Sequence, residues 1–204
     1  MLLFRSIFCK FRTPNTTNHI VMKKIIVLVL LTVFTSVNSF AQEINWVSLE
    51  EAVALQKKTP KKIMMDMYTV WCGPCKMLDR NTFQNKDVAD YVNKYYYAVK
   101  FNAEGNDEVE FKGKTYTNPN YDPAKAKRRN GSHELARYFK IQAYPTIIFL
   151  DENLELLTPL RGYKTPQDLE LYLKLFKNND YKDMDTQEKF NAYYKAFKPE
   201  FQSE

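Results

Sequence analysis

The sequence contains very little cysteine and histidine, with 3 cysteines and 2 histidines among 204 residues. Cys9 and His19 lie in the first 41 residues, so the rest of the chain keeps Cys72, Cys75 and His133. A structural zinc site takes four ligands, typically of these two types. A closed Cys/His zinc site within one chain is therefore excluded, and we expect neither a metal nor another cofactor.

The chain also lacks an apolar run of the roughly 20 residues that a membrane-spanning helix needs. The run Ile25 to Val37 follows Lys23 and Lys24 and is shorter than that. Small residues near Ala41 suit a signal peptidase, so the pattern predicts a secretory signal with cleavage near Ala41. The alternative is an uncleaved membrane anchor.

Two further features define this leader, residues 1–41. No cysteine stands at the cleavage point, which argues against a lipoprotein. A complete signal begins at Met22, so Met22 is a candidate for the true start of the chain. Cleavage predicts a periplasmic or secreted protein.

Beyond the leader the chain has almost no net charge. The whole sequence has 30 Lys and Arg against 24 Asp and Glu, but five of the basic residues and none of the acidic ones lie in residues 1–41. The remaining 25 basic and 24 acidic residues give no reason to expect a nucleic-acid partner. Internal repeats and low-complexity segments are also lacking, and the length suits one domain better than two.

The residues from 48 to 101 have the pattern of a β-α-β unit. Ser48 and Glu51 have the spacing of a capping box, which predicts a first helix. The apolar stretch 62–68 is typical of a buried central strand, and the turn after it opens a second helix. The expected elements are a helix to about Lys58, a strand at Lys62–Tyr68, a helix opened by Trp71–Cys75, a helix at Asp87–Tyr95 and a strand at Tyr97–Phe101.

A polar segment, residues 103–131, interrupts this pattern and is interpreted as an insertion with a small hairpin around 109–116. Its basic cluster, residues 125–129, is interpreted as a solvated loop, with a docking site as the alternative. After it, Ser132 is expected to cap a helix through Phe139, with His133 as a surface residue at the helix start.

The remaining elements are expected to be a strand, a hairpin and two helices. Thr165, Pro166 and Asp168 mark the start of the first of these helices. Asp185 and Glu188 form another possible capping box for an appended C-terminal helix. The expected elements are a strand at Thr146–Leu150, its hairpin partner at Leu154–Leu160, a helix through Phe176 and a last helix with Phe190, Tyr194 and Phe197.

Cys72 and Cys75 are separated by Gly73 and Pro74 at a helix start. Backbone N–H groups and the helix dipole favour a thiolate at Cys72, and Cys75 lies one turn further on, within reach of it. A structural disulfide would close too small a loop to constrain the unfolded chain much. An accidental pair of buried cysteines is the other alternative, and a redox-active pair is the favoured interpretation.

The segment Trp71 to Lys76 resembles the active-site segment of the thioredoxin superfamily. Further matches follow in chain order between about residues 44 and 177. They are Asp66 as a buried carboxylate, Lys100 as its lysine partner, Tyr144-Pro145-Thr146 as a cis-proline loop and Gly162 as a glycine near the site. The resemblance implies an α/β thioredoxin-like fold, with a central mixed sheet flanked by helices.

The expected domains are therefore the leader, a thioredoxin-like domain at 42–177 that carries its insertion before the cis-proline loop, and a C-terminal helical extension at 178–204. Thr82-Phe83 and Val88 resemble the thioredoxin-like domains of periplasmic reductases such as the C-terminal domain of DsbD. The usual proline near Arg80 is missing, and Tyr68 and Thr69 also depart from the thioredoxin pattern.

The resemblance also implies roles for these residues. Cys72 would attack a substrate disulfide, and Asp66 would accept the proton of Cys75. The backbone before a cis Pro145 would pair with an extended substrate. The implied substrate-binding residues are Trp71, Gly73, Pro74, Tyr144, Pro145 and Thr146, with Lys100 and Gly162 in support.

The function expected from these features is that of an extracytoplasmic protein disulfide reductase. Its partners would be protein disulfides and a membrane thiol reductase that donates electrons, with membrane contact only through an uncleaved leader. The Gly-Pro spacer resembles that of reducing thioredoxins. The alternatives are a disulfide oxidase or isomerase, and a binding or chaperone module in which the cysteines are incidental.

Overall fold

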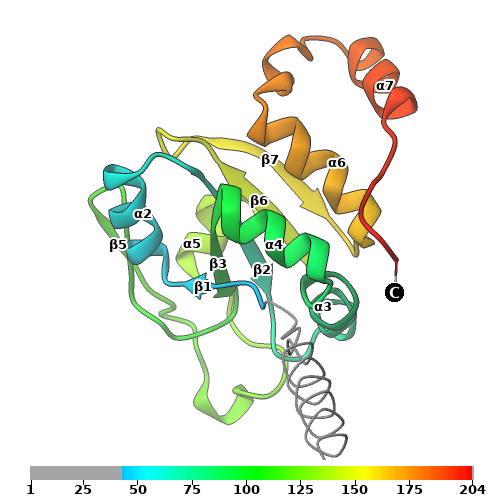
Figure 1. The fold of residues 1–204 in the computed structure, drawn as a ribbon. Helices are drawn as coiled ribbons and strands as arrows, with labels where there is room; N and C mark the ends of the chain where they lie inside the picture. The colour runs from blue at the N-terminus through cyan, green and yellow to red at the C-terminus, as the bar shows by residue number, and fades with distance from the viewer. Residues whose placement is uncertain (1–42, 204) are drawn as a thin grey trace, which may run out of the picture. The chain divides into compact units, whose positions relative to one another are not determined.

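The computed structural model of the protein describes residues 43–203, and Figure 1 shows how their helices and strands are arranged. The predicted leader and signal peptide, residues 1–41, lie outside the described residues. Of the helices that are described, none has the length and apolar character needed to cross a membrane.

A five-stranded mixed sheet lies at the centre, with strand order β1-β3-β2-β6-β7. The first three strands in this order are parallel, and β6 and β7 are antiparallel to their neighbours. The strands are β1 Trp46–Val47, β2 Lys62–Tyr68, β3 Tyr96–Asn102, β6 Thr146–Leu150 and β7 Leu156–Arg161. The predicted mixed sheet and the strands expected at 62–68 and 146–150 are confirmed.

Strand β7 begins two residues later than predicted. Leu154 has a positive φ of 63° and belongs to the turn. The Asp151 carboxylate accepts hydrogen bonds from the backbone N–H groups of Asn153 and Glu155, which extends this turn before the strand can start.

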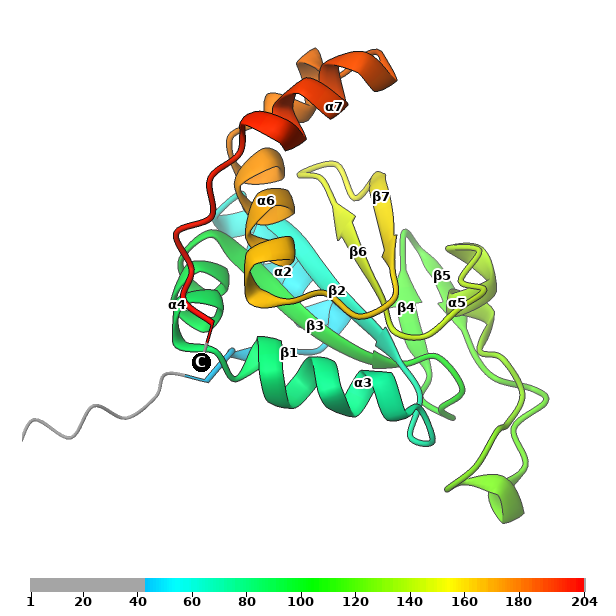
Figure 2. The ribbon, with the colours of Figure 1, turned by 90° about the vertical axis from the view of Figure 1, so that its right-hand side faces the viewer.

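Helices cover both faces of the sheet (Figures 1 and 2). Ile63 and Met65 of β2 pack in one core cluster with residues of α2 and α5, whereas Met64 packs in the other with residues of α3, α4 and α6. The helices are α2 Leu49–Lys58, α3 Gly73–Leu78, the π-helix η1 Asp79–Phe83, α4 Lys86–Tyr95, α5 Glu134–Tyr138 and α6 Pro166–Lys177. Because side chains alternate along a strand, Asp66 faces the same side as Met64, toward α3.

Two predicted helix starts are confirmed and two are shifted by one residue. The Ser48 hydroxyl accepts from the Glu51 N–H, and Thr165 and Asp168 form a reciprocal capping box. The cap of α5 is His133 instead of Ser132, and the cap of α7 Gln187–Ala196 is Thr186 instead of Asp185. In both cases the residue that caps has an extended backbone, and its side chain accepts from a free N–H group of the first turn, that of Leu135 in α5 and that of Lys189 in α7.

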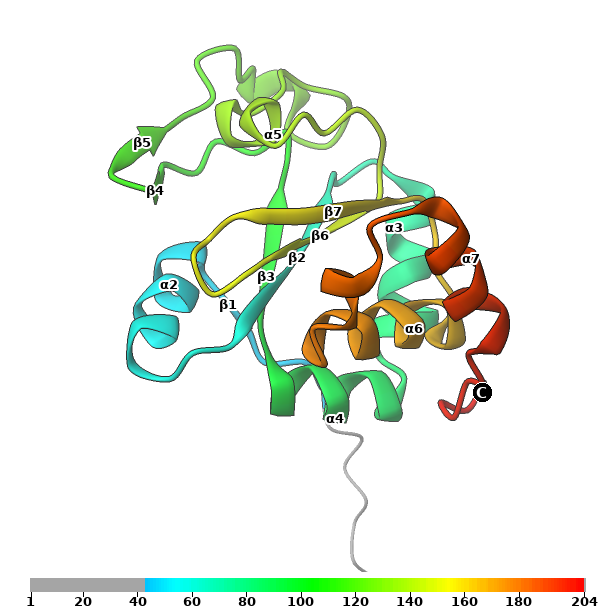
Figure 3. The same ribbon diagram turned by 90° about the horizontal axis from the view of Figure 1, so that it is seen from above.

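The insertion folds into a short hairpin and a loop, drawn in green in Figure 3. Strands β4 Val109–Phe111 and β5 Lys114–Tyr116 pair antiparallel, as predicted, and the 3₁₀ helix η2 spans Pro123–Lys125. His133 is fully buried, so its expected place on the surface is wrong. Its ring accepts from the Leu135 N–H and hydrogen-bonds the Asp107 carbonyl, which joins α5 to the insertion.

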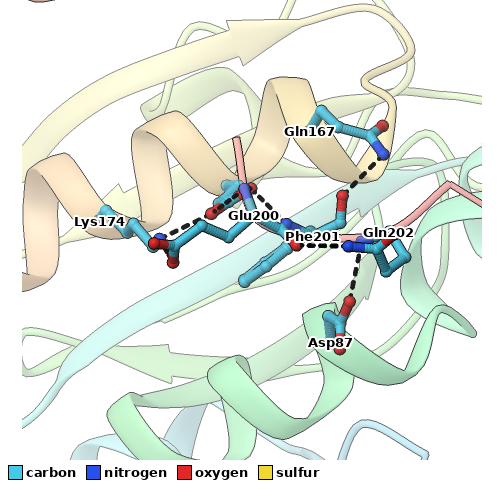
Figure 4. Close-up of polar contacts among 7 residues, drawn as sticks. Asp87, Gln167, Lys174, Glu200, Phe201 and Gln202 are labelled. Carbon is cyan, nitrogen blue, oxygen red and sulfur yellow. Dashed lines mark hydrogen bonds and ion pairs between the residues drawn. The ribbon is translucent and has the colours of Figure 1, made fainter. Parts of the chain in front are cut away.

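The C-terminal segment packs on α6 and α4. Phe190 of α7 stacks on Tyr172 of α6 at 6.3 Å between ring centroids. The 3₁₀ helix η3 Asp180–Asp183 lies between α6 and α7. After α7, the last described residues run back along α6 (Figure 4). The backbone N–H groups of Glu200 and Phe201 donate to the carboxylate of the fully buried Glu170.

Candidate active site

The cysteine pair lies at the junction between β2 and α3. Cys72 is the N-cap residue of α3, and its Sγ accepts a hydrogen bond of 3.1 Å from the Cys75 N–H. The two cysteines form a disulfide. Each of the two residues is buried, with 3% of its surface exposed. When the disulfide is reduced, the free N–H groups and positive dipole of the helix start favour a thiolate at Cys72.

Asp66 is buried on the face of β2 that is turned toward α3, and strand register places Lys100 directly beside it. The Lys100 Nζ lies 3.6 Å from Asp66 Oδ2, while Oδ1 has no hydrogen-bond partner among the described residues. Burial raises the pKa of Asp66 to about 7, although the Lys100 ammonium lowers it; the nearby Asp79 carboxylate adds to the rise. A carboxyl group with this pKa can take up and release a proton near neutral pH.

Asp79 completes this charged group and was missed in the sequence. Its carboxylate forms an ion pair with the same Lys100 ammonium that approaches Asp66. Asp79 lies four residues after Cys75, on the same side of the helix, and its N–H donates to the Cys75 carbonyl. That i, i+4 spacing from a redox cysteine is the signal that could have identified it.

The cis-proline loop lies against Trp71. The Tyr144–Pro145 peptide bond is cis, and the rings of Trp71 and Tyr144 meet edge to face at 6.2 Å between centroids. Gly162, at φ +80°, donates its N–H to the Pro145 carbonyl at 2.8 Å. The Thr146 hydroxyl donates to the Ala143 carbonyl at 2.8 Å. The structure therefore brings the implied substrate-binding residues of two loops together, with Gly73 and Pro74 exposed on α3.

Glu104 is a second residue that the sequence analysis missed. Its buried carboxylate accepts from Trp71 Nε1 at 2.7 Å and from the Asn130 N–H at 2.8 Å. The Arg129 guanidinium lies over the indole ring of the same tryptophan, 4.7 Å from the ring centroid. The basic cluster is exposed, as predicted, but it is not only a solvated loop, since Arg129 contacts the active-site tryptophan. A single glutamate at the start of a polar segment carries no pattern that would have identified it.

The described residues of the site do not form a metal-binding cluster. Within residues 43–203, no cluster of three or more His, Cys, Asp or Glu side chains is placed to hold a metal ion. The chemistry available to the described side chains is thiol-disulfide exchange at Cys72 and Cys75 with proton transfer at Asp66.

Comparison with known proteins gives the same result for fold and family. A family described as a thioredoxin-like domain matches residues 49–177, more than half of the chain. The chain is 34% identical over 61 residues to the thiol:disulfide interchange protein DsbD of Vibrio vulnificus, which is 30% of this chain and 10% of that protein. The match thus spans about a tenth of the length of this curated relative.

A solved structure is similar in fold. A thioredoxin-fold protein from Helicobacter pylori superposes with a TM-score of 0.52 at 23% identity, covering 66% of this chain and 83% of that chain. The C-terminal domain of Neisseria meningitidis DsbD in its oxidised form matches with a TM-score of 0.41 at 15% identity, covering 64% of this chain and 90% of that chain.

Proposed function

The chain belongs to the thioredoxin-like family, as a thiol-disulfide oxidoreductase, and we propose that it acts in the periplasm or outside the cell as a protein disulfide reductase. The observation that carries this proposal is the Cys72–Cys75 pair at the start of α3, with the buried Asp66 facing the same helix. The signal-like pattern of residues 1–41 supports the location.

The proposed reaction has two exchange steps. The Cys72 thiolate attacks one sulfur of a substrate disulfide, which forms a Cys72–substrate disulfide and releases the other substrate sulfur as a thiolate. Cys75 then loses its proton to Asp66 and attacks the Cys72 sulfur. The second substrate thiolate leaves, so the substrate gains two electrons and the protein is left with its Cys72–Cys75 disulfide.

Substrate binding is proposed for the surface around Trp71 and Tyr144. The backbone preceding Pro145 would pair with an extended substrate segment as an added strand, while Trp71 offers an apolar contact surface. Gly162 supports this surface by donating its N–H to the Pro145 carbonyl. Lys100 supports the proton acceptor instead, since it lowers the pKa of Asp66.

The reducing direction is supported by the Gly-Pro spacer, which resembles that of reducing thioredoxins. A reductase outside the cytoplasm needs a donor of electrons, and the proposed donor is a membrane dithiol reductase that reduces the Cys72–Cys75 disulfide. The short match to DsbD, a thiol:disulfide interchange protein, supports a donor that exchanges thiols and disulfides.

The reduction potential of the Cys72–Cys75 pair, measured by equilibration with glutathione, tests the direction. We expect a potential near those of reducing thioredoxins, about −270 mV, and rapid reduction of insulin disulfides. A potential near the oxidising end, about −120 mV, would replace the reductase with an oxidase or isomerase. Unchanged biological activity in Cys72→Ser would instead support a binding or chaperone module.

A further inference from the structure

We propose that the loop of residues 122–130, here called the basic loop, selects substrates whose disulfide is flanked by acidic residues. The inference rests on the proposed exchange reaction, in either direction, and adds the class of protein that the site prefers. It is carried by the charge of the loop, by the bonds that hold it and by its contact with Trp71.

The basic loop is strongly positive. It carries four cationic side chains, Lys125, Lys127, Arg128 and Arg129, against the single carboxylate of Asp122. Lys125 pairs with Asp122 at 3.0 Å. The other three cations are exposed and form no ion pair with the residues that the structure describes. The loop therefore has uncompensated charge, although the chain after residue 41 is nearly neutral.

Side-chain hydrogen bonds close the basic loop into a defined conformation. Asn130 Oδ1 accepts from the backbone N–H groups of Asp122 and Gly131, and Asn130 Nδ2 donates to the Asp122 carbonyl, each at 2.8 Å. At Gly131 a Cβ would lie 2.5 Å from the Asn120 carbonyl oxygen, so only glycine fits this approach. The charges are thus presented on a loop that is ordered before a substrate arrives.

The basic loop is joined to the active site through Trp71, the residue before Cys72. Glu104 Oε2 accepts from both the Trp71 indole and the Asn130 N–H, and Arg129 lies over the indole ring. Tyr144 is part of the same group, because its ring meets the Trp71 ring edge to face at 6.2 Å between centroids. Figure 2 shows the loop at the same end of the sheet as the start of α3.

This arrangement favours an acidic protein segment as the occupant. A substrate strand paired with the backbone at Tyr144 would pass beside Arg129, and its disulfide would have to approach Cys72 within reach of the loop. Cations fixed beside a reactive group accelerate the approach of anionic partners by 10- to 1,000-fold, an effect that salt screens. The rate of exchange should therefore depend on the charge of residues next to the substrate cystine.

Three disulfide peptides test this inference. They are identical except that the residues flanking the cystine are acidic, neutral or basic, and each is supplied in disulfide and dithiol form, so that either direction of exchange can be followed. The measured quantity is the second-order rate constant of each charged peptide divided by that of the neutral peptide. This ratio removes any general change in the reactivity of Cys72.

The test variant is Lys127→Gln/Arg128→Gln, and the matched control is Lys57→Gln/Lys58→Gln. Lys57 and Lys58 are exposed at the end of α2, before β2 begins, whereas Cys72 follows the other end of β2. We expect the wild type and the control to exchange with the acidic peptide about tenfold faster than with the neutral one at low salt. The advantage should fall severalfold in the test variant and at high salt.

Equal rates for the three peptides, together with normal exchange, would overturn this inference and leave the proposed function intact. Equal peptide rates combined with inhibition by single-stranded RNA would assign the basic loop to a nucleic acid and would also overturn it. Absence of exchange with every peptide, in both directions, would overturn the proposed function and this inference with it.

Discussion

Asp66 has a carboxyl group that is 1% exposed and a pKa that burial raises to about 7, from 3.8 when unperturbed. In the unfolded chain the group ionises near the lower value. Below that pH both states hold the proton, and as pH rises the unfolded state loses it first, so Asp66 progressively destabilises the folded protein until its folded pKa is passed.

Asp66→Asn should therefore stabilise the protein at about pH 8, by a few kcal/mol, because it removes the cost of a buried charge. The gain should shrink as the pH falls and disappear at about pH 4. Chemical denaturation of the oxidised protein across this range measures it. The control is Glu108→Gln, because Glu108 is exposed. Asp87→Asn at the start of α4 is not suitable, because the Asp87 carboxylate accepts a hydrogen bond from the Gln202 N–H. A gain that does not change with pH would contradict the pKa assigned here.

The same substitution should slow the second exchange step. Because Asp66 can accept the Cys75 proton only when it is ionised, decay of the mixed disulfide should accelerate as the pH rises toward about 7 in the wild type. In Asp66→Asn this acceleration should be lost, and the decay at neutral pH should slow by about 100-fold. Single-turnover kinetics with a disulfide peptide separate this step from the first attack. The same pH profile in both proteins would exclude Asp66 as the acceptor.

Glu104 is expected to position Trp71. Glu104→Ala leaves the Trp71 indole N–H and the Asn130 N–H without their acceptor, which should cost about 1–3 kcal/mol of stability. Trp71 should also become more mobile, with a shift in its fluorescence and a higher KM for peptide disulfides. Glu108→Ala, an exposed change in the same insertion, is the control and should alter neither. Unchanged fluorescence in Glu104→Ala would contradict the positioning role.

At the scale of elements, the C-terminal segment is held by a carboxylate that the sequence did not single out. Glu170 is fully buried on α6, pairs with Lys174 at 2.7 Å and accepts from two backbone N–H groups of residues 200–201. Gln202 adds a bond to Asp87 of α4, and Gln167 one to the Phe201 carbonyl (Figure 4). These bonds place the chain end across two helices.

Glu170→Gln should release this segment. The amide keeps the size of the side chain but loses the charge that strengthens its hydrogen bonds, and it leaves Lys174 without its buried partner. We expect a loss of about 1–3 kcal/mol and faster amide exchange at residues 200–202. Glu110→Gln, an exposed change on β4, should leave both unchanged. Unaltered exchange at residues 200–202 in Glu170→Gln would show that other contacts hold the segment.

Local sequence patterns predicted the start of a helix well where a single residue could act as its N-cap. Ser48 and Thr165 mark their helices within the sequence, and both starts are confirmed. At α5 two neighbouring residues, Ser132 and His133, could each cap, and the burial of His133 depends on the insertion folding back to place the Asp107 carbonyl beside it. Local pattern carries no information about that contact.

At the scale of the whole molecule, the sheet explains which parts of the site could be predicted. Cys72 and Cys75 lie three residues apart in the sequence. Asp66 and Lys100 were implied by a family resemblance, and the register of β2 with β3 places them side by side. Glu104 and Arg129 are brought to Trp71 only by the path of the insertion. Such contacts between distant segments leave no periodic pattern in the sequence.

The most direct test of the central claim is capture of substrates by Cys75→Ser in the native envelope. Without Cys75 the second exchange step cannot occur, so we expect stable mixed disulfides between Cys72 and protein substrates. These complexes should disappear on treatment with a reducing agent and be absent in Cys72→Ser/Cys75→Ser. Failure to capture any protein, together with failure of the wild type to reduce insulin, would contradict a thiol-disulfide exchange function.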